Sequence, residues 1–294
     1  MIYTFVNKLL LFPLYYTLKF RHFLFDKGIF ESKKFDIPII SIGNISMGGT
    51  GKTPHTEFLI KELLPKYKVA VLSRGYGRKT RGFRLVEVND KVSEVGDEPL
   101  QMKKKFADVI VAVCEKRVKG VETLLVLPPE QRPTVILLDD AFQHRWISPK
   151  TNIVLVDYSM PLDKEFLFPI GRLRDLPEQI QRADIIIVTK CPDEISPEDR
   201  FEWGKNLRLS SKQKLLFSNI SYGEPDSIFE GADRRYIYSK FAILITAIAN
   251  PLPLIYHLLS NYRIIGRLEF RDHHNFTSSE VSKINRLAKK WPKA

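Results

Sequence analysis

The 294-residue sequence has little of what marks several common classes of protein. It contains only two cysteines, Cys114 and Cys191, and both lie beside apolar runs, as is typical of reduced core thiols in a cytoplasmic protein. It has no internal repeat, no long run of Lys or Arg, no zinc-ligand spacing and no signature of a nucleic-acid-binding fold. The excess of 46 Lys and Arg over 34 Asp and Glu therefore favours phosphorylated small molecules or anionic lipid over nucleic acid as partners.

Long hydrophobic runs are also missing. The uninterrupted apolar stretch at 9–16 is far shorter than the ~20 residues that a membrane-spanning helix requires, and Pro13 interrupts it. The first residues also lack the early basic region and the small-residue cleavage site of a secretory signal. We therefore expect the N-terminal segment to remain on the mature protein.

Residues 1–25 are instead rich in Leu, Phe and Tyr, with one narrow polar stripe at helical spacing. The stripe consists of Thr4, Lys8, Tyr15, Lys19, His22 and Asp26. The pattern predicts an amphipathic helix with two alternative locations. The helix either lies in a membrane interface, with Lys8, Lys19 and Arg21 near anionic headgroups, or packs on the protein's own core.

The strongest local signal is a glycine-rich turn at 46–53, between an apolar strand at 37–42 and a predicted helix at 53–64. Its members are Ser46, Met47, Gly48, Gly49, Thr50, Gly51, Lys52 and Thr53. Pro54 fits the first position of the helix, and Ser46 stands where the usual P-loop pattern has Gly. The alternative is an ordinary glycine-rich turn between a strand and a helix.

Such a loop binds nucleotide phosphates, because glycines let several backbone N–H groups and the helix N-terminus converge on one anion. Lys52 would reach the β- and γ-phosphates, and Thr53 would hold Mg²⁺. A second signal supports this interpretation, since the apolar strand at 134–138 ends in Asp139 and Asp140. Carboxylates at that end of a buried parallel strand lie beside a P-loop, where they can organise Mg²⁺. The sequence thus predicts a nucleotide that carries β- and γ-phosphates, bound together with Mg²⁺.

Further apolar strands at 69–73, 109–114, 152–157 and 183–190 alternate with helical stretches. This alternation predicts an α/β fold: a P-loop NTPase-like parallel sheet with helices on both faces. A polar region near residue 226 separates a smaller C-terminal α/β domain, with strands at 241–249 and 264–270. We predict an N-terminal membrane-interface helix at 1–27, a P-loop kinase domain at 28–227 and the smaller domain at 228–294.

Three other patterns have alternative interpretations. The loop at 74–78 carries Arg74 and Arg78, which either grip an anion or are solvated. Asp97 can be a simple helix cap. The adjacent His273 and His274 suggest a metal, but no further ligand stands at a convincing spacing. The run at 189–193 is similar to a guanine-reading motif with its Asp one position late, so guanine specificity is not supported.

Several stretches taken together resemble the tetraacyldisaccharide 4′-kinase family, over nearly the whole chain. The resemblance rests on residues 43–44, 48–54, 73–78, 96–99, 139–140, 142–145, 248–251 and 272–274. It implies phosphoryl transfer from ATP to the 4′-hydroxyl of a tetraacyldisaccharide 1-phosphate, a lipid A precursor, at the cytoplasmic face of the bacterial inner membrane. The enzyme would be peripheral or monotopic there, with no nucleic acid and no obligate protein partner.

The resemblance also assigns residues. Asp97 and His273 match the family's catalytic pair, with Lys52 as the third catalytic residue. Metal ligands would be Thr53, Asp139, Asp140 and Asp175. Substrate-binding residues would be Asn44, Arg74, Arg78, Arg117, Arg145 and Arg174. Asp175 stands where the family commonly has Glu, and the chain stops at Ala294 before a further strand that the family usually has, so we expect an incomplete C-terminal domain.

Two alternatives to the lipid kinase come from the residues alone. The first is a P-loop switch or scaffold protein that binds nucleotide at the membrane without phosphorylating a small molecule. The second is a soluble P-loop kinase or ligase acting on a water-soluble metabolite, which the N-terminal helix disfavours.

Overall fold

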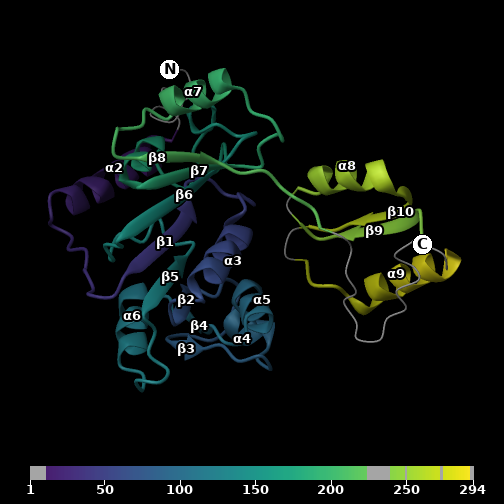
Figure 1. Ribbon diagram of the computed structural model, residues 1–294, viewed down its shortest axis with the longest axis horizontal. Coiled ribbons are helices and arrows are strands. Elements are labelled where there is room, and N and C mark those ends of the chain that lie inside the picture. The colour runs from purple at the N-terminus through teal and green to yellow at the C-terminus, as the bar shows by residue number, and fades with distance from the viewer. Residues whose placement is uncertain (1–10, 224–238, 249, 272–273, 292–294) are drawn as a thin grey trace. The chain divides into compact units, whose positions relative to one another are not determined.

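The computed structural model divides the chain into two compact units, residues 1–220 and 221–294 (Figure 1). It describes residues 11–223, 239–248, 250–271 and 274–291. The predicted domain boundary between residues 227 and 228 lies outside these ranges, as do residues 1–10 of the predicted N-terminal helix.

An eight-stranded sheet runs through the first unit in the order β3-β4-β2-β5-β1-β6-β7-β8. All neighbouring strands are parallel except β3 and β4. The strands are β1 (Ile39–Asn44), β2 (Val69–Ser73), β3 (Arg84–Leu85), β4 (Ile110–Val113), β5 (Val135–Asp139), β6 (Thr151–Asp157), β7 (Ile185–Thr189) and β8 (Lys214–Phe217). The predicted parallel α/β sheet is confirmed.

Helices cover both faces of this sheet because successive side chains of each strand point to opposite sides. Val71 and Leu137 pack with Ile60 of α3 (Lys52–Leu63) and Met102 of α5 (Asp97–Lys105). The alternate positions of the same strands pack on α6 (Arg117–Leu125), while Val154 and Val156 share a core with α7 (Pro197–Asn206). The first unit is completed by α2 (Phe12–Asp26), α4 (Val92–Val95), η1 (Leu162–Lys164) and η2 (Pro177–Arg182).

The register of β1 and β5 fixes the position of the site. Ile42 of β1 lies opposite Asp139 of β5, so the glycine-rich turn and the two carboxylates leave the sheet at the same edge. Helix α3 begins one residue earlier than predicted, at Lys52, because Gly51 takes a left-handed conformation (φ +85°) at its N-cap. Pro54 is therefore the third helical residue, still within the first turn where its missing N–H has no intrahelical partner.

Helix α2 packs on the protein through Tyr15, His22 and Phe25, which are buried. Of its predicted polar stripe, Tyr15 and His22 therefore face the core, whereas Lys19 and Asp26 are exposed. Large apolar side chains are also exposed, Phe12 at 59% and Phe20 at 62%. No helix in the described parts of the chain is long and apolar enough to span a bilayer.

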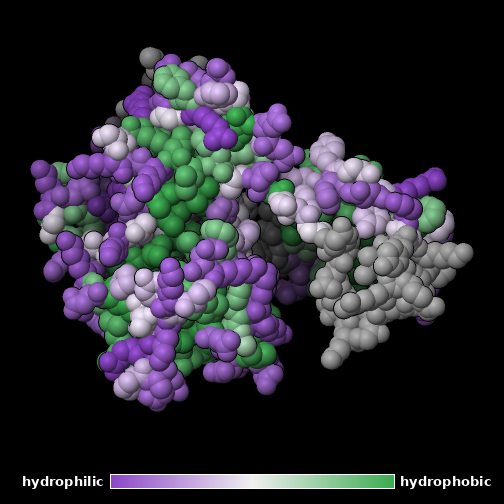
Figure 2. All heavy atoms as spheres, in the orientation of Figure 1, coloured by the Kyte–Doolittle hydropathy of each residue, from purple (hydrophilic) through white to green (hydrophobic). Residues whose placement is uncertain are grey.

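The second unit pairs β9 (Phe241–Thr246) with β10 (Arg263–Glu269) in parallel, joined by α8 (Leu252–Asn261) and followed by α9 (Ser278–Lys290). This agrees with the predicted small α/β arrangement. On the view of the first unit in Figure 2, hydrophilic side chains lie along the periphery and hydrophobic ones appear between them. Scattered apolar surface of this kind is normal and marks no site by itself.

Candidate active site

The glycine-rich turn between β1 and α3 has the backbone of a phosphate cradle. Gly48 (φ +103°) and Gly51 (φ +85°) adopt left-handed conformations that favour glycine. A Cβ placed on Gly48 meets nothing within 4 Å, so the loop faces open space there. Residues 47–49 are exposed and residues 51–53 are half-buried, whereas the Ser46 and Thr50 side chains are buried. The surface of the loop that is open to a ligand is thus formed by residues 47–49 and 51–53, and the side chains of Ser46 and Thr50 point inwards and hold the loop.

The loop is fixed from several sides. Asn44 Nδ2 donates a hydrogen bond to Thr50 Oγ1 (2.7 Å), and Thr189 Oγ1 donates to the Thr50 carbonyl (2.9 Å). Met47 N donates to the Arg172 carbonyl (2.6 Å). Asn44 was expected to bind substrate, and the structure corrects this: its side chain is fully buried and positions the loop. A cradle held in this way needs little reorganisation when it binds phosphate.

Oxygen atoms from three elements gather beside Lys52. Thr53 Oγ1 of α3 donates to Glu98 Oε1 of α5 (3.1 Å), and Asp139 of β5 accepts from Thr56 Oγ1 (3.3 Å). Burial raises the pKa of Asp139 to about 7, and the negative charges of Glu98 and Asp140 add to this effect. Glu98 was not among the residues predicted for the site, although it directly follows Asp97 at the start of α5.

These donors fit Mg²⁺, which prefers hydroxyl and carboxylate oxygens. Within the described ranges, no three His, Cys, Asp or Glu side chains form a metal-binding group. That suits a nucleotide-associated Mg²⁺, which uses one or two carboxylates and completes its coordination with phosphate oxygens and water. Thr53, Glu98 and Asp139 are the residues that would hold it.

Asp140 forms ion pairs with two cationic side chains of the chain itself, Arg174 and Lys52. It takes a left-handed conformation (φ +45°), and both of its oxygens accept from Arg174, at 3.0 and 2.7 Å. Lys52 Nζ lies 3.9 Å from Asp140 Oδ1. Burial would raise the pKa of Asp140, but the Arg174 hydrogen bonds and the Lys52 charge outweigh it, and the pKa is lowered. Asp140 therefore positions Lys52. Arg174 was expected to bind substrate, but in the structure it donates hydrogen bonds to Asp140 and to the Asn44 amide oxygen.

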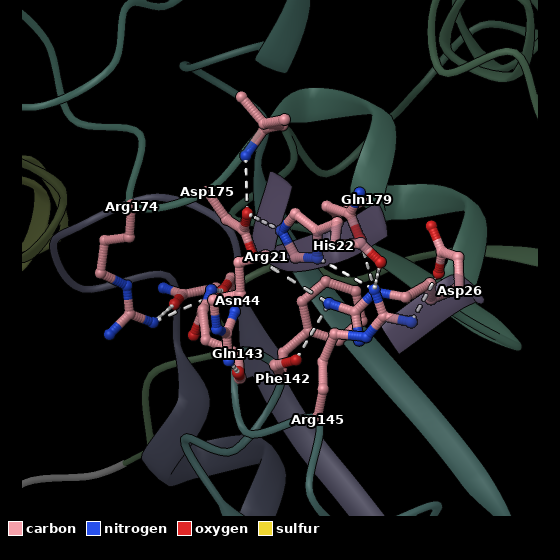
Figure 3. A network of polar contacts seen from close by, with 12 residues as sticks. Arg21, His22, Asp26, Asn44, Phe142, Gln143, Arg145, Arg174, Asp175 and Gln179 are labelled. Atoms are coloured by element: carbon pink, nitrogen blue, oxygen red, sulfur yellow. Dashed lines mark hydrogen bonds and ion pairs between the residues drawn. The ribbon is translucent and has the colours of Figure 1, made fainter. Parts of the chain in front are cut away.

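Two further predicted site residues belong to a different network, shown in Figure 3. Asp175 is fully buried and accepts from His22 Nε2 (2.6 Å) and from Leu176 N (2.9 Å). Arg145 donates to Asp26 Oδ1 (2.7 Å) and to His22. We therefore correct both expectations. Asp175 is a buried partner of His22 rather than an open metal ligand, and Arg145 anchors α2 rather than substrate.

The remaining predicted arginines differ in accessibility. Arg78 is paired with Glu115 (2.7 Å) and the Gly82 carbonyl (2.7 Å), and its side chain is only 2% exposed. Arg117 is buried, donates to the Cys114 carbonyl (3.3 Å), and has its pKa lowered to about 10 by burial. Only Arg74 of these three has an exposed side chain. Of the predicted anion-binding arginines, the structure leaves Arg74 accessible and corrects the assignments of Arg78 and Arg117.

The predicted catalytic pair is only partly described. Asp97 is the first residue of α5, half-buried, and its Oδ1 accepts from Glu98 N (2.9 Å). His273 lies outside the described residues, so the pair remains a prediction. Its neighbour His274 bonds Glu280 Oε2 (3.0 Å) and stacks on Phe270 at 4.8 Å, contacts that stabilise the start of α9.

A parallel sheet, a glycine-rich cradle with lysine and threonine in the first helical turn, and an acid at the end of the adjacent strand define a P-loop nucleotide-binding protein. A family model described as tetraacyldisaccharide-1-P 4′-kinase matches residues 8–292. The chain belongs to this family.

Individual relatives agree with this assignment. A tetraacyldisaccharide 4′-kinase of Parabacteroides distasonis is 43% identical over 93% of this chain and 75% of its own length. One from Bacteroides fragilis is 46% identical, over 90% and 72%. The crystal structure of LpxK from Aquifex aeolicus in complex with ATP superimposes with a TM-score of 0.67 at 27% identity, covering 94% of this chain and 85% of that one.

Proposed function

We propose that the chain transfers the γ-phosphoryl group of ATP to the 4′-hydroxyl of a tetraacyldisaccharide 1-phosphate, giving the 1,4′-bisphosphorylated lipid. The enzyme is a kinase of the tetraacyldisaccharide 4′-kinase type, with ATP as donor. The observation that carries the proposal is the cradle at residues 47–53 beside the oxygen cluster of Thr53, Glu98 and Asp139. That geometry suits a nucleoside triphosphate with its divalent cation.

In this reaction the chain acts mainly by positioning and by electrostatics. The exposed loop amides and Lys52 compensate the negative charge that spreads over the phosphoryl oxygens in the transition state. Asp140 and Arg174 hold Lys52 and the loop in place. The cation, when bound, neutralises phosphate charge. Asp97 is our candidate for accepting the proton of the 4′-hydroxyl.

Changes at Thr53 and Glu98 should raise the Mg²⁺ concentration that the enzyme needs. We expect Thr53→Ala and Glu98→Gln each to increase the half-saturating Mg²⁺ concentration by about 10- to 100-fold, because each removes an oxygen that holds or orients the ion. Mg²⁺ titrations of turnover at fixed ATP would measure this. Glu122→Gln, an exposed change on α6, is the control. Unaltered Mg²⁺ dependence in both variants would remove these residues from the metal site.

We further propose that the enzyme acts as a peripheral or monotopic protein at the cytoplasmic face of the inner membrane. Support comes from α2, whose exposed residues include Phe12, Leu14, Tyr16, Phe20 and Phe23. An apolar helix face suits the headgroup region, where an acylated acceptor presents its sugar. The basic excess of the chain favours anionic lipid surfaces.

Replacing apolar residues on this face should separate membrane binding from nucleotide binding. We expect the double variant Phe12→Ser/Phe20→Ser to pellet with anionic vesicles at least about 10-fold less than wild type, because burial of each aromatic ring contributes roughly 1.5–3 kcal/mol. Binding of Mg-ATP without lipid should not change. The Val126→Ser variant, on an exposed residue elsewhere, is the matched control. Wild-type pelleting by the double variant would contradict the proposed surface.

The function itself is tested with γ-labelled ATP, Mg²⁺ and the disaccharide acceptor in detergent micelles. We expect the label to move into the organic-soluble glycolipid and into no water-soluble acceptor. A switch or scaffold protein would leave the lipid unlabelled. Label released only as inorganic phosphate would therefore argue against the kinase.

A further inference from the structure

Helix α2 is connected to the interior of the first unit by a set of polar contacts (Figure 3). His22 is 3% exposed, and its Nε2 lies 2.6 Å from Asp175 Oδ1. Arg21 donates to the Gln143 carbonyl (2.7 Å), and Arg145 donates to Asp26 Oδ1 (2.7 Å). An attachment through simple packing would not require a buried imidazole and carboxylate, since buried polar groups cost free energy unless they are hydrogen-bonded.

The partners of His22 determine the direction of its hydrogen bonds. Arg145 Nη1 lies 3.0 Å from His22 Nδ1, and a guanidinium can only donate. Nδ1 is therefore the acceptor, and Nε2 carries the hydrogen that is donated to Asp175. One imidazole thus joins two loops, residues 141–146 and residues 172–176.

Both loops contact residues of the nucleotide site. Arg174, the neighbour of Asp175, bonds both oxygens of Asp140, and its backbone N donates to the Ile45 carbonyl (2.8 Å) at the start of the P-loop. From the other loop, Gln143 Nε2 donates to the Asn44 carbonyl (2.7 Å). His22 therefore contacts Asp175, the neighbour in sequence of Arg174, which bonds Asp140. Asp140 in turn lies 3.9 Å from Lys52.

His22 supplies one of only two hydrogen bonds that the Asp175 carboxylate accepts among the described residues. Its Oδ1 accepts from His22 and from Leu176 N, while Oδ2 is buried without a hydrogen-bond partner among the described residues. Arg182 Nη2 lies 4.0 Å from Oδ2, at the limit of an ion pair. Without the imidazole, a fully buried carboxylate would keep a single hydrogen bond, which strongly favours movement of the segment towards new partners.

We propose that His22 is a positioning residue for phosphoryl transfer: through Asp175 it fixes residues 172–176, so that Arg174 holds Asp140 and the P-loop in the geometry that binds Mg-ATP. Helix α2 is then a part of the nucleotide site as well as a surface element. This inference rests on the proposed function of the P-loop, and its test separates the two.

The test compares His22→Leu, which removes the donor, with His22→Gln, whose amide nitrogen can still donate to Asp175. Binding of a fluorescent ATP analogue to the full chain, with Mg²⁺ and without lipid, keeps membrane attachment out of the measurement. We expect about 10-fold weaker binding for His22→Leu, the lower end of what the loss of an orienting group costs, and less than about 3-fold for His22→Gln. Thr17→Ala, an exposed change on the same helix, should match wild type.

The outcomes are decisive when each variant is shown to unfold in one cooperative thermal transition. A folded His22→Leu variant with wild-type affinity for the Mg-bound analogue would overturn the inference. If His22→Leu does not fold, Asp175→Ala replaces it, because it removes both the acceptor of the His22 hydrogen bond and the buried charge. Wild-type binding by folded Asp175→Ala would then overturn the inference. Asp140→Ala serves as the reference, since an unaltered affinity there would instead refute the proposed nucleotide site.

Discussion

Replacing Lys52 by alanine is expected to abolish phosphoryl transfer while leaving the fold intact. Lys52 is the first residue of α3, and its ammonium group lies 3.9 Å from Asp140. The transition state of phosphoryl transfer spreads charge over oxygens that the protein must stabilise. Loss of one preorganised donor costs about 10²–10³-fold, and loss of a full positive charge should cost at least about 10³-fold.

The fold should survive this change because Asp140 retains both hydrogen bonds from Arg174. Initial rates with the lipid acceptor measure the loss, and circular dichroism with thermal melting confirms the fold. Lys61→Ala, an exposed change on the same helix, is the control. Near wild-type turnover by Lys52→Ala would contradict the assignment of the P-loop.

The second large effect is expected at Asp97. The acceptor is an alcohol whose proton must leave as the O–P bond forms, and a carboxylate is a suitable acceptor near neutral pH. Because the transition state is loose, little proton removal is needed early, so we expect Asp97→Asn to lower kcat by about 10²–10⁴-fold. The asparagine amide oxygen can still accept from Glu98 N, so the start of α5 should be preserved.

Rates at saturating ATP and acceptor measure this effect, with Asp108→Asn, an exposed change, as control. His273→Ala should cost less than Asp97→Asn. If the two residues act as one unit, the double variant will be hardly slower than Asp97→Asn alone. Multiplicative losses would mean independent roles, and a loss below about 10-fold for Asp97→Asn would exclude it as the base.

The parts of the site that could be predicted from the sequence are those that depend on short motifs of consecutive residues. An apolar strand followed by a glycine-rich turn, and a second strand ending in Asp139 and Asp140, determine which edge of the sheet binds phosphate. The positions of β1, β2, β4, β5, β6 and β7 followed from their apolar runs, whereas the short edge strands β3 and β8 were not predicted. Helix ends were less certain, because the conformation of Gly51 decided where α3 begins.

The residues that were missed or misassigned depend on distant contacts. Glu98 reaches Thr53 across 45 positions, and nothing local distinguishes it from a helix-starting acid. Asp175 and Arg145 look like open ligands in sequence, but His22 lies 153 positions from the first and 123 from the second. Charge in a loop predicts an ion partner without saying whether that partner is a ligand or another part of the chain.

Helix α2 shows the same limit. Its periodicity predicted one polar stripe, and either face could have been the outer one. The contact of His22 with the buried Asp175 carboxylate marks the side of the helix that packs inwards, and Phe12 and Phe20 are exposed.

The most direct test of the proposed site is a crystal structure of the full chain with Mg²⁺ and a non-hydrolysable ATP analogue. We expect the γ-phosphate against the amides of residues 48–52 and within hydrogen-bond reach of Lys52 Nζ, with the ion on Thr53 Oγ1 and beside Glu98 and Asp139. An analogue bound away from the cradle, or an ion that touches neither Thr53 nor either carboxylate, would contradict it.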